Sequence, residues 1–269
     1  MMSAPYVLVI AGHDPTGGAG IQADIEALSS MGCRAATAVT ALTVQDTRNV
    51  ASFVATPASL LMAQAEAVLN DLPISAIKIG MIASEENVRV IAALLQAWPQ
   101  LPVVLDPVLS AGGGGALSKG DMAACIRELL LPKVTLITPN SLEARLLCPD
   151  ADSVESCGKL LSKHMRGHVL ITGGHEEGDT ICNRLWFRSQ CLDERRWPRL
   201  DGEFHGSGCT LASACAAGLA HGRKVIDASG DAQTYTWRSL CRATSPGAGQ
   251  AIPHRYFWWP QEAFACEKT

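Results

Sequence analysis

The stretch 204–222 reads FHGSGCTLASACAAGLAHG, a glycine turn that runs directly into a helix of small and apolar residues. Gly206, Ser207 and Gly208 form the turn, and glycines allow tight backbone turns in which successive N–H groups converge on one point. The helix adds the unpaired amides of its first turn and the positive end of its dipole. We therefore expect an anion site here, for which a phosphate group is the best guest. The alternative is a glycine loop that only leads into a buried helix.

Cys209 lies at the mouth of this predicted anion site. A thiol at a helix N-terminus commonly has a lowered pKa, because the helix dipole favours the thiolate. The position therefore predicts a reactive thiol.

The rest of the chain alternates apolar, strand-like runs with helical patterns. The strand-like runs are 6–11, 35–46, 49–57, 76–82, 102–108, 134–140 and 168–174. Helices are expected on Ile21, Ile25 and Leu28 with Gly32 at the end, and over 57–72, 84–97, 119–130, from 141, 153–166 and 228–243. Because β-α units with short connections give parallel strands and right-handed crossovers, we expect a mostly parallel sheet flanked by helices. We find no linker or repeat, so residues 1–269 are expected to form a single α/β domain.

Three segments depart from this rhythm. Residues 180–190 resemble a strand pair or hairpin, and the polar run 193–203 resembles a connection that leads to the Cys209 turn. The segment SAGGGGALS, 110–118, is expected to be a flexible loop.

Composition excludes several classes of function. The net charge of -4 disfavours a nucleic-acid partner, since binding a phosphate backbone needs a basic surface. The ten cysteines include no C-x-x-C pair, which disfavours a zinc site. The N-terminus lacks the basic region of a signal peptide, and no run approaches the roughly 20 apolar residues of a membrane span. We expect a cytoplasmic protein with reduced thiols.

Polar residues follow several of the predicted strands. Asp14, Gln45, Asp106 and Asn140 all stand at strand ends. Each one alone could be a turn-former or a helix cap. The carboxyl ends of parallel strands meet at one edge of a sheet, where ligands bind, so we expect these side chains to gather there with the Cys209 turn.

Six motifs in this order resemble the hydroxymethylpyrimidine and phosphomethylpyrimidine kinases of thiamine biosynthesis, a branch of the ribokinase-like fold. They are GHDPTGGAGIQAD at 12–24, KIGM at 78–81, VVLDPV at 103–108, ITPNSLEA at 137–144, TGGH at 172–175 and HGSGCT at 205–210. The tail GAGQAIPHRYFWW, 247–259, resembles the ending of that family, so the resemblance spans nearly the whole chain. It implies a three-layer α/β/α sandwich.

The resemblance also implies a reaction. Enzymes of this family move the γ-phosphoryl group of ATP onto 4-amino-5-hydroxymethyl-2-methylpyrimidine and then convert the monophosphate to the diphosphate, with Mg²⁺, commonly as homodimers. Residues 206–208 and the amide of Cys209 would form the anion hole for the phosphoryl group. The thiol of Cys209 would be the base, in the position where ribokinase relatives have an aspartate. Alternatively, Cys209 packs and contributes only its amide.

The substrate residues follow from the same resemblance. Gln45 would bind the aminopyrimidine edge, because its amide offers a donor and an acceptor together. Gly12, Ala19 and Met81 would line the ring pocket. Asp24 would either hold the substrate or be structural.

The nucleotide residues are implied in the same way. Asn140 and Glu143 would organise Mg²⁺ and its waters around the ATP phosphates, with Asp106 as a second metal candidate. Thr172 and Gly174 would bind ATP. Many relatives have lysine where this chain has Thr172, which removes a positive charge near the phosphates. His175 and His205 lie near the site, and we expect solvated or capping roles for them.

Two other interpretations stay open. A pyridoxine or pyridoxal kinase is the nearest, and Gln45 favours the aminopyrimidine only weakly. A non-catalytic pyrimidine-binding protein on the same fold is conceivable because of Thr172.

Overall fold

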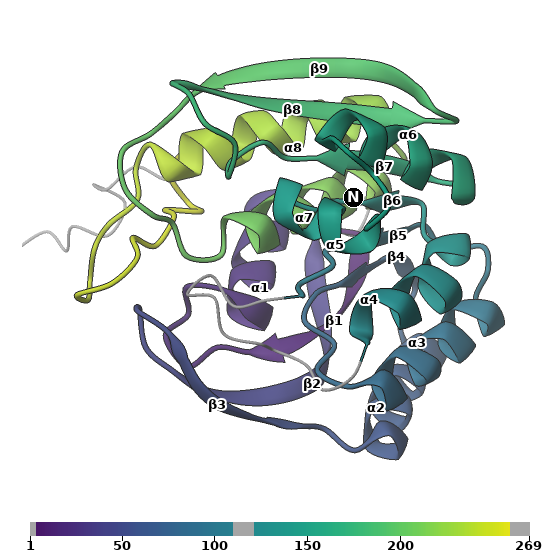
Figure 1. Ribbon diagram of the computed structural model, residues 1–269. Coiled ribbons are helices and arrows are strands. Elements are labelled where there is room, and N and C mark those ends of the chain that lie inside the picture. Colours follow the sequence, from purple (N-terminus) through teal and green to yellow (C-terminus); the bar gives the residue numbers. More distant parts are fainter. Residues whose placement is uncertain (1–3, 110–120, 259–269) are drawn as a thin grey trace, which may run out of the picture.

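The predicted strands form one sheet. The computed structural model describes residues 4–109 and 121–258, and in them nine strands are ordered β3-β2-β1-β4-β5-β6-β7-β8-β9 (Figure 1). The strands are β1 Tyr6–His13, β2 Arg34–Gln45, β3 Val50–Ala55, β4 Ile74–Ile79, β5 Val103–Leu105, β6 Leu136–Ile137, β7 His168–Ile171, β8 Thr180–Phe187 and β9 Gln190–Pro198.

The centre of the sheet is parallel and its two edges are antiparallel. Strands β2, β1, β4, β5, β6 and β7 pair in parallel. β3 pairs antiparallel with β2, and β8 and β9 form an antiparallel extension beyond β7. The predicted mostly parallel α/β fold is confirmed, and the carboxyl ends of the six parallel strands share one edge.

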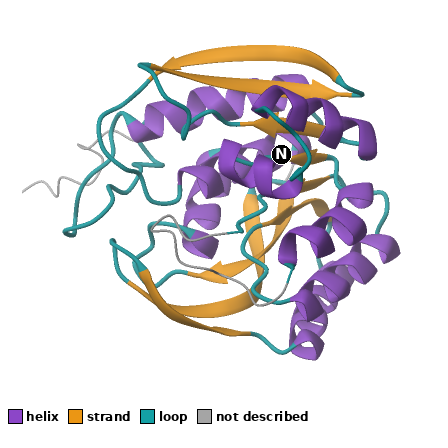
Figure 2. Ribbon diagram, viewed as in Figure 1, coloured by secondary structure: helices purple, strands orange, loops and turns teal. Residues whose placement is uncertain are grey.

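Helices cover both faces of the sheet and give three layers (Figure 2). The helices are α1 Gly20–Ser30, α2 Ala58–Asp71, α3 Glu85–Ala97, α4 Met122–Cys125, α5 Ser141–Leu147, α6 Val154–His164, α7 Ser207–Ala220 and α8 Val225–Leu240. One core packs α2 to α6 against one sheet face, and the other packs α1, α7 and α8 against the opposite face. Because both faces are covered, strands such as β1 are apolar almost throughout.

The segment 193–203 was wrongly predicted to be a connection. Its first half belongs to β9, which pairs with β8 along the whole hairpin at the top of Figure 1. The polar sequence hid this strand because one side of it faces solvent, with alternating exposed and half-buried residues.

Two helices differ from their predicted bounds. The helix predicted over 228–243 begins at Val225 and ends at Leu240. The one predicted over 119–130 consists of α4 and a π-helical turn, Ile126–Leu130, and its first residues lie outside the described part of the chain, as does the predicted loop 110–118.

Helix α1 buries Ile21 and Leu28 as predicted, but not Ile25. Ile25 is 39% exposed, whereas Asp24 is fully buried beside Ala27 and Leu28. The helix therefore turns a carboxylate toward the sheet, and this requires a buried partner.

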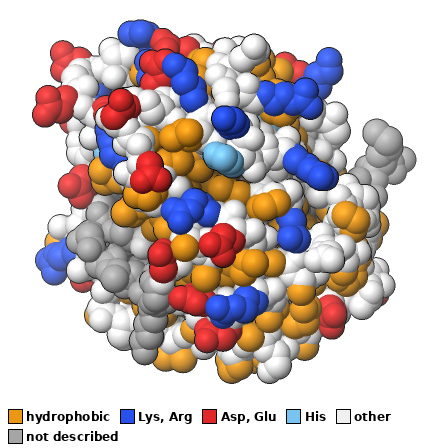
Figure 3. All heavy atoms as spheres, turned by 45° about the vertical axis from the view of Figure 1, so that its right-hand side comes forward, with side chains coloured by type: hydrophobic (Ala, Val, Ile, Leu, Met, Phe, Trp, Pro, Cys, Tyr) orange, Lys and Arg blue, Asp and Glu red, His pale blue; other side chains and the backbone are white. Residues whose placement is uncertain are grey.

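The surface carries charges of both signs. On the face shown in Figure 3, acidic and basic side chains are interspersed with hydrophobic ones. Within residues 4–109 and 121–258, no helix is both long enough and apolar enough to cross a membrane.

Candidate active site

A cavity of about 340 Å³ opens at the carboxyl edge of the parallel strands. This volume suits a small ligand. Every residue predicted for the site except Asp24 lines the cavity: Gly12, Ala19, Gln45, Met81, Asp106, Asn140, Glu143, Thr172, Gly174, Gly206, Ser207, Gly208 and Cys209. As expected from their positions at strand ends, residues that follow six strands lie together with the start of α7.

The glycine turn has the geometry of an anion hole. Gly206 is the N-cap of α7 and has a left-handed backbone with φ of 73°. The first intrahelical bond is donated by Thr210 N to Gly206 O at 2.9 Å, so the amides of Ser207, Gly208 and Cys209 precede the helix ladder. A Cβ on Gly206 would collide with Gly18 O, so only glycine lets these two turns meet.

The predicted lowering of the Cys209 pKa is wrong. Cys209 is partly exposed at the cavity wall, but burial of its surroundings raises the pKa of the thiol to about 12, although the charge of Lys78 opposes this. The helix dipole is outweighed because poor hydration and the nearby carboxylates of Asp106 and Asp24 disfavour the thiolate. The resting cysteine is therefore a thiol.

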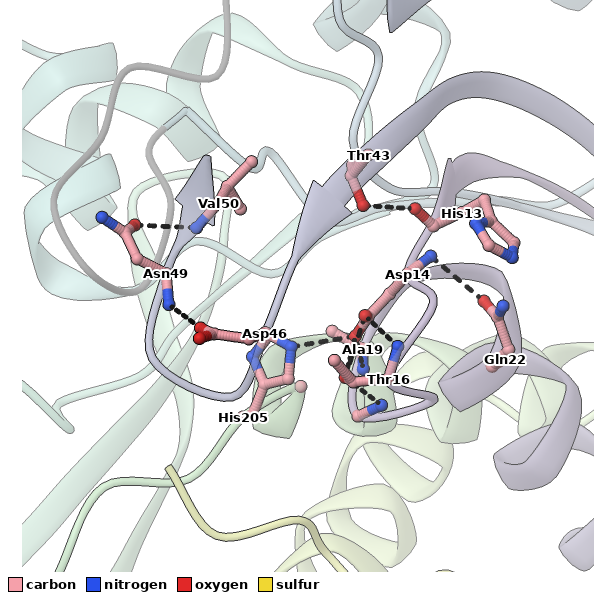
Figure 4. Close-up of polar contacts among 12 residues, drawn as sticks. His13, Asp14, Thr16, Ala19, Gln22, Thr43, Asp46, Asn49, Val50 and His205 are labelled. Carbon is pink, nitrogen blue, oxygen red and sulfur yellow. Dashed lines mark hydrogen bonds and ion pairs between the residues drawn. The ribbon is translucent and has the colours of Figure 1, made fainter. Parts of the chain in front are cut away.

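Asp14 organises the loop between β1 and α1 (Figure 4). Its Oδ1 accepts hydrogen bonds from Thr16 N at 2.8 Å and Thr16 Oγ1 at 2.9 Å, and its Oδ2 accepts from Ala19 N at 2.7 Å. Oδ2 also lies 2.9 Å from His205 Nε2. Burial alone would raise the pKa of Asp14, but hydrogen bonds from His205, Gln45, Thr16 and Ala19 lower it. The carboxylate joins the loop to the segment that enters the anion hole.

A solvated or capping role is expected for His205 from the sequence, but its side chain contacts Asp14 at the cavity wall. Its imidazole covers Gly18, where a Cβ would collide with the ring, and lines the cavity. Its backbone N donates to Ala251 O at 2.9 Å.

Asp24 does not line the cavity, and its geometry fits the structural alternative. Lys78 Nζ lies 2.8 Å from Asp24 Oδ1, both side chains are fully buried, and Ser213 Oγ donates to the same carboxylate at 2.7 Å. These two partners account for a carboxylate buried in the interior.

Lys78 was missed as a site residue. It lines the cavity and is the only Lys or Arg to do so in the described part of the chain. Burial alone would lower its pKa, but the charges of Asp24 and Asp106 raise it, so the ammonium stays charged. A lysine inside the apolar run 76–82 was the available signal, since a buried charge needs a partner.

Asp106 and Glu143 form a pair of close carboxyl groups. Burial raises the pKa of Glu143 to about 8, and the charge of Asp106 adds to this. Burial also raises the pKa of Asp106 to about 6 against the opposing charge of Lys78. Glu143 Oε2 accepts from Asn140 N at 3.0 Å while Asn140 Oδ1 accepts from Glu143 N at 2.9 Å, a capping box that fixes both side chains.

These carboxyl groups fit a divalent cation that brings other ligands with it. A cation would stabilise the ionised forms of these two carboxyl groups, whose pKa values are raised in its absence. Mg²⁺ in particular binds few protein carboxylates directly. In the described residues no three or more His, Cys, Asp or Glu side chains gather as a complete metal site. The donor set therefore suits a metal held jointly with phosphate oxygens.

The opposite end of the cavity is aromatic and was not predicted. Trp197 and Trp237 stack with centroids 5.8 Å apart, and both line the cavity. Gln233 Oε1 accepts from Trp197 Nε1 at 3.2 Å and from Asn183 Nδ2 at 3.1 Å. Thr236 Oγ1 is buried here with no hydrogen-bond partner among the described residues. This end suits a flat heteroaromatic group.

Comparison with known proteins identifies the family. The family model for phosphomethylpyrimidine kinase matches residues 14–254. The chain belongs to the phosphomethylpyrimidine kinase family. It is therefore a kinase, with ATP as co-substrate.

Individual relatives agree with this assignment. A hydroxymethylpyrimidine/phosphomethylpyrimidine kinase of Rhizobium meliloti is 37% identical over 261 residues, which cover 94% of this chain and 97% of that protein. The crystal structure of phosphomethylpyrimidine kinase from Clostridium difficile is 30% identical with a TM-score of 0.76, covering 88% of this chain and 99% of that one. An ADP complex of Bacillus subtilis pyridoxal kinase is 25% identical with a TM-score of 0.86, covering 95% and 99%.

We predict that Glu143→Gln flattens the pH dependence of stability. The folded-state pKa of Glu143 is about 8 against an ordinary 4.5, so its contribution to stability is fully present below pH 4.5 and is lost as the pH rises through 8. Glutamine keeps the capping box and does not ionise. Urea unfolding of the metal-free kinase at several values of pH between 5 and 8 measures the slope. The exposed Glu155, paired with Lys159, gives the control Glu155→Gln, which should keep the wild-type slope. An unchanged slope in Glu143→Gln would contradict the prediction.

Proposed function

We propose that this kinase transfers the γ-phosphoryl group of ATP to 4-amino-5-hydroxymethyl-2-methylpyrimidine and then to its monophosphate, as a step of thiamine biosynthesis. One observation carries the proposal: a single cavity joins Gln45 at one end, the Gly206 turn in the middle and the tryptophan pair at the other end. Gln45 offers a donor and an acceptor to an aminopyrimidine. The tryptophan end would take the adenine.

The anion hole supplies most of the catalysis. Phosphoryl transfer needs positioning and charge stabilisation more than covalent chemistry. The first turn of α7 and Lys78 both line the cavity, and the charge of Lys78 is close enough to act on the thiol of Cys209 in that turn. Lys78 thus places a fixed charge at the acceptor side of the transfer, whereas Thr172 supplies only hydrogen bonding at the nucleotide side.

Cys209 and Asp106 form the proton-accepting pair in this proposal. The Asp106 carboxyl lies close to the thiol: its negative charge raises the pKa of Cys209, and a Cβ on the preceding Gly208 would lie only 3.6 Å from Asp106 Oδ2. As the substrate hydroxyl attacks the γ-phosphorus and the bond to the bridging oxygen of ADP breaks, the hydroxyl proton passes to Sγ while the thiol proton passes to the Asp106 carboxylate, and ADP leaves. This relay needs no thiolate in the resting enzyme, which fits a thiol pKa of about 12 and an Asp106 pKa of about 6.

Mg²⁺ belongs to the same proposal. Glu143 would hold it, which leaves the Asp106 carboxylate to accept the proton, and the bound ion would neutralise charge on the ATP phosphates. The raised pKa of Glu143 supports this assignment.

Product analysis tests the proposed function. The full chain is incubated with hydroxymethylpyrimidine and ATP, with Mg²⁺ or with EDTA, and the products are identified by mass spectrometry. We expect the monophosphate and then the diphosphate, with formation of both lost in EDTA. Pyridoxine is assayed in parallel, and a higher kcat/KM for pyridoxine than for hydroxymethylpyrimidine would show that the enzyme is a pyridoxine kinase. Substrate binding without ATP consumption would indicate a non-catalytic binding protein.

Substitution of Cys209 tests the relay. We expect Cys209→Ala and Asp106→Asn each to lower kcat about 100-fold, the lower end of general base effects. Cys209→Ser should lose less, because its hydroxyl can pass a proton in the same way. Because the two residues act in one proton relay, kcat of the double variant should be little lower than that of either single variant. Near-normal turnover of Cys209→Ala would show that Cys209 contributes only its backbone amide.

A homodimer is the proposed assembly. Leu42, Val44 and Val54 are 58%, 63% and 72% exposed and share the face of β2 and β3 that points away from the cavity. Leu42 pairs directly with Val54, so the three make one apolar patch on an edge of the sheet. Sedimentation velocity should give a dimer for the wild type and a monomer for Val44→Lys. The exposed Leu146 of α5 provides the control Leu146→Lys, which should stay dimeric. A monomeric wild type would contradict the proposal.

A further inference from the structure

Arg255 is a buried cation that the reaction chemistry leaves unused. Its side chain is fully buried, although it lies close to the end of the described chain. It does not line the cavity. Placing a guanidinium in the interior is costly unless every donor finds an acceptor, so its contacts identify its purpose.

The guanidinium contacts both walls of the anion hole. Nη2 donates to Gly18 O on the β1–α1 loop, and Nε donates to Thr210 Oγ1 at 2.9 Å in the first turn of α7. Thr210 Oγ1 in turn donates to Gly206 O at 2.8 Å. One cation is thus linked directly to Gly18 and through a single hydroxyl to Gly206, the two residues whose backbones touch.

Other bonds hold Arg255 itself in place. Its Nη1 donates to Glu26 Oε2 at 3.0 Å. Its carbonyl oxygen accepts from Tyr235 Oη at 2.7 Å and from Ser30 Oγ at 2.7 Å. The guanidinium is therefore held by α1 and the backbone of Arg255 by α1 and α8, in addition to the two turns that the side chain joins.

We propose that Arg255 is a positioning residue that sets the spacing between the Gly18 turn and the first-turn amides of α7. The inference rests on the proposed function, since those amides are the phosphoryl-transfer donors. Displacement of such donors by about 1 Å costs about 100-fold in rate. The residue acts on the reaction only through the two turns and contacts neither substrate.

Steady-state kinetics with chemical rescue tests this role. We expect Arg255→Ala to lower kcat about 100-fold with KM for both substrates within about threefold of wild type, because the pockets for the pyrimidine and the adenine stay intact. Guanidinium at about 20 mM should restore a measurable part of kcat by refilling the vacated site, and sodium chloride at equal ionic strength should not. A folded Arg255→Ala variant with wild-type kcat, or a loss that guanidinium does not reverse, overturns the proposal.

Two further variants separate positioning from folding. Thr210→Val cuts the link to Gly206 with little change of volume, and it should lower kcat about tenfold even if Arg255→Ala fails to fold; an unchanged kcat overturns the proposal. Tyr235→Phe removes the hydrogen bond to the backbone carbonyl of Arg255 and leaves both turns unchanged. It should lower the melting temperature and leave kcat unchanged, and a kcat loss equal to that of Arg255→Ala would reduce the role of Arg255 to folding.

A readout without substrate keeps this test distinct from the proposed function. Alkylation of Cys209 by iodoacetamide, followed by peptide mass spectrometry, reports how closely the two turns enclose the thiol. We expect alkylation several-fold faster in Arg255→Ala than in wild type, and equal rates overturn the proposal. If the wild type forms no phosphorylated pyrimidine, the proposed function fails while this measurement still decides the role of Arg255.

Discussion

The phosphoryl site depends on two backbone turns that meet with no side chain between them. Gly206 could not carry a Cβ, because Gly18 O occupies the space, and its left-handed backbone starts α7 at that point. The contact sets the direction of the helix and therefore where its first-turn amides converge. Asp14 and His205 bridge the same two segments from the cavity side, and Arg255 joins them from the interior. Much of the polar bonding around the site serves this one contact.

The residues at the carboxyl edge of the sheet could be predicted from the sequence, because the direction of each strand decides which of its ends lies at that edge. Once 6–11, 102–108 and 134–140 are recognised as parallel strands, Asp106 and Asn140 must lie at a common edge whatever the details of packing. Residues such as Gln45 then fall on the cavity side by alternation along β2. The boundaries of elements were less predictable, since β9 is polar on one side and α8 begins without a side-chain cap.

Residues that act through distant partners could not be placed in this way. Lys78 has a function only because α1 turns Asp24 inward, and the role of Asp24 stayed open between substrate binding and structure because local sequence does not show which face of a helix is buried. The Gln233 network likewise joins β8, β9 and α8, three segments that local patterns treat separately. For Cys209 the sequence supplied the helix dipole but not the desolvation, and desolvation is the larger effect on a thiol in this position.

The charges in the site show why a cation should accompany the nucleotide. Lys78 is already bonded to Asp24, so its charge is only partly available to the two other buried carboxyl groups, Asp106 and Glu143. Their pKa values rise to about 6 and about 8, so near neutral pH Glu143 retains its proton, at the place where a bound cation would put positive charge, while Asp106 is mostly ionised. Binding of that cation would release the proton from Glu143 and lower the pKa of Asp106. Loss of that proton would open the Glu143 carboxylate to the cation, whereas Asp106, already mostly ionised near neutral pH, would stay available as the proton acceptor beside Cys209.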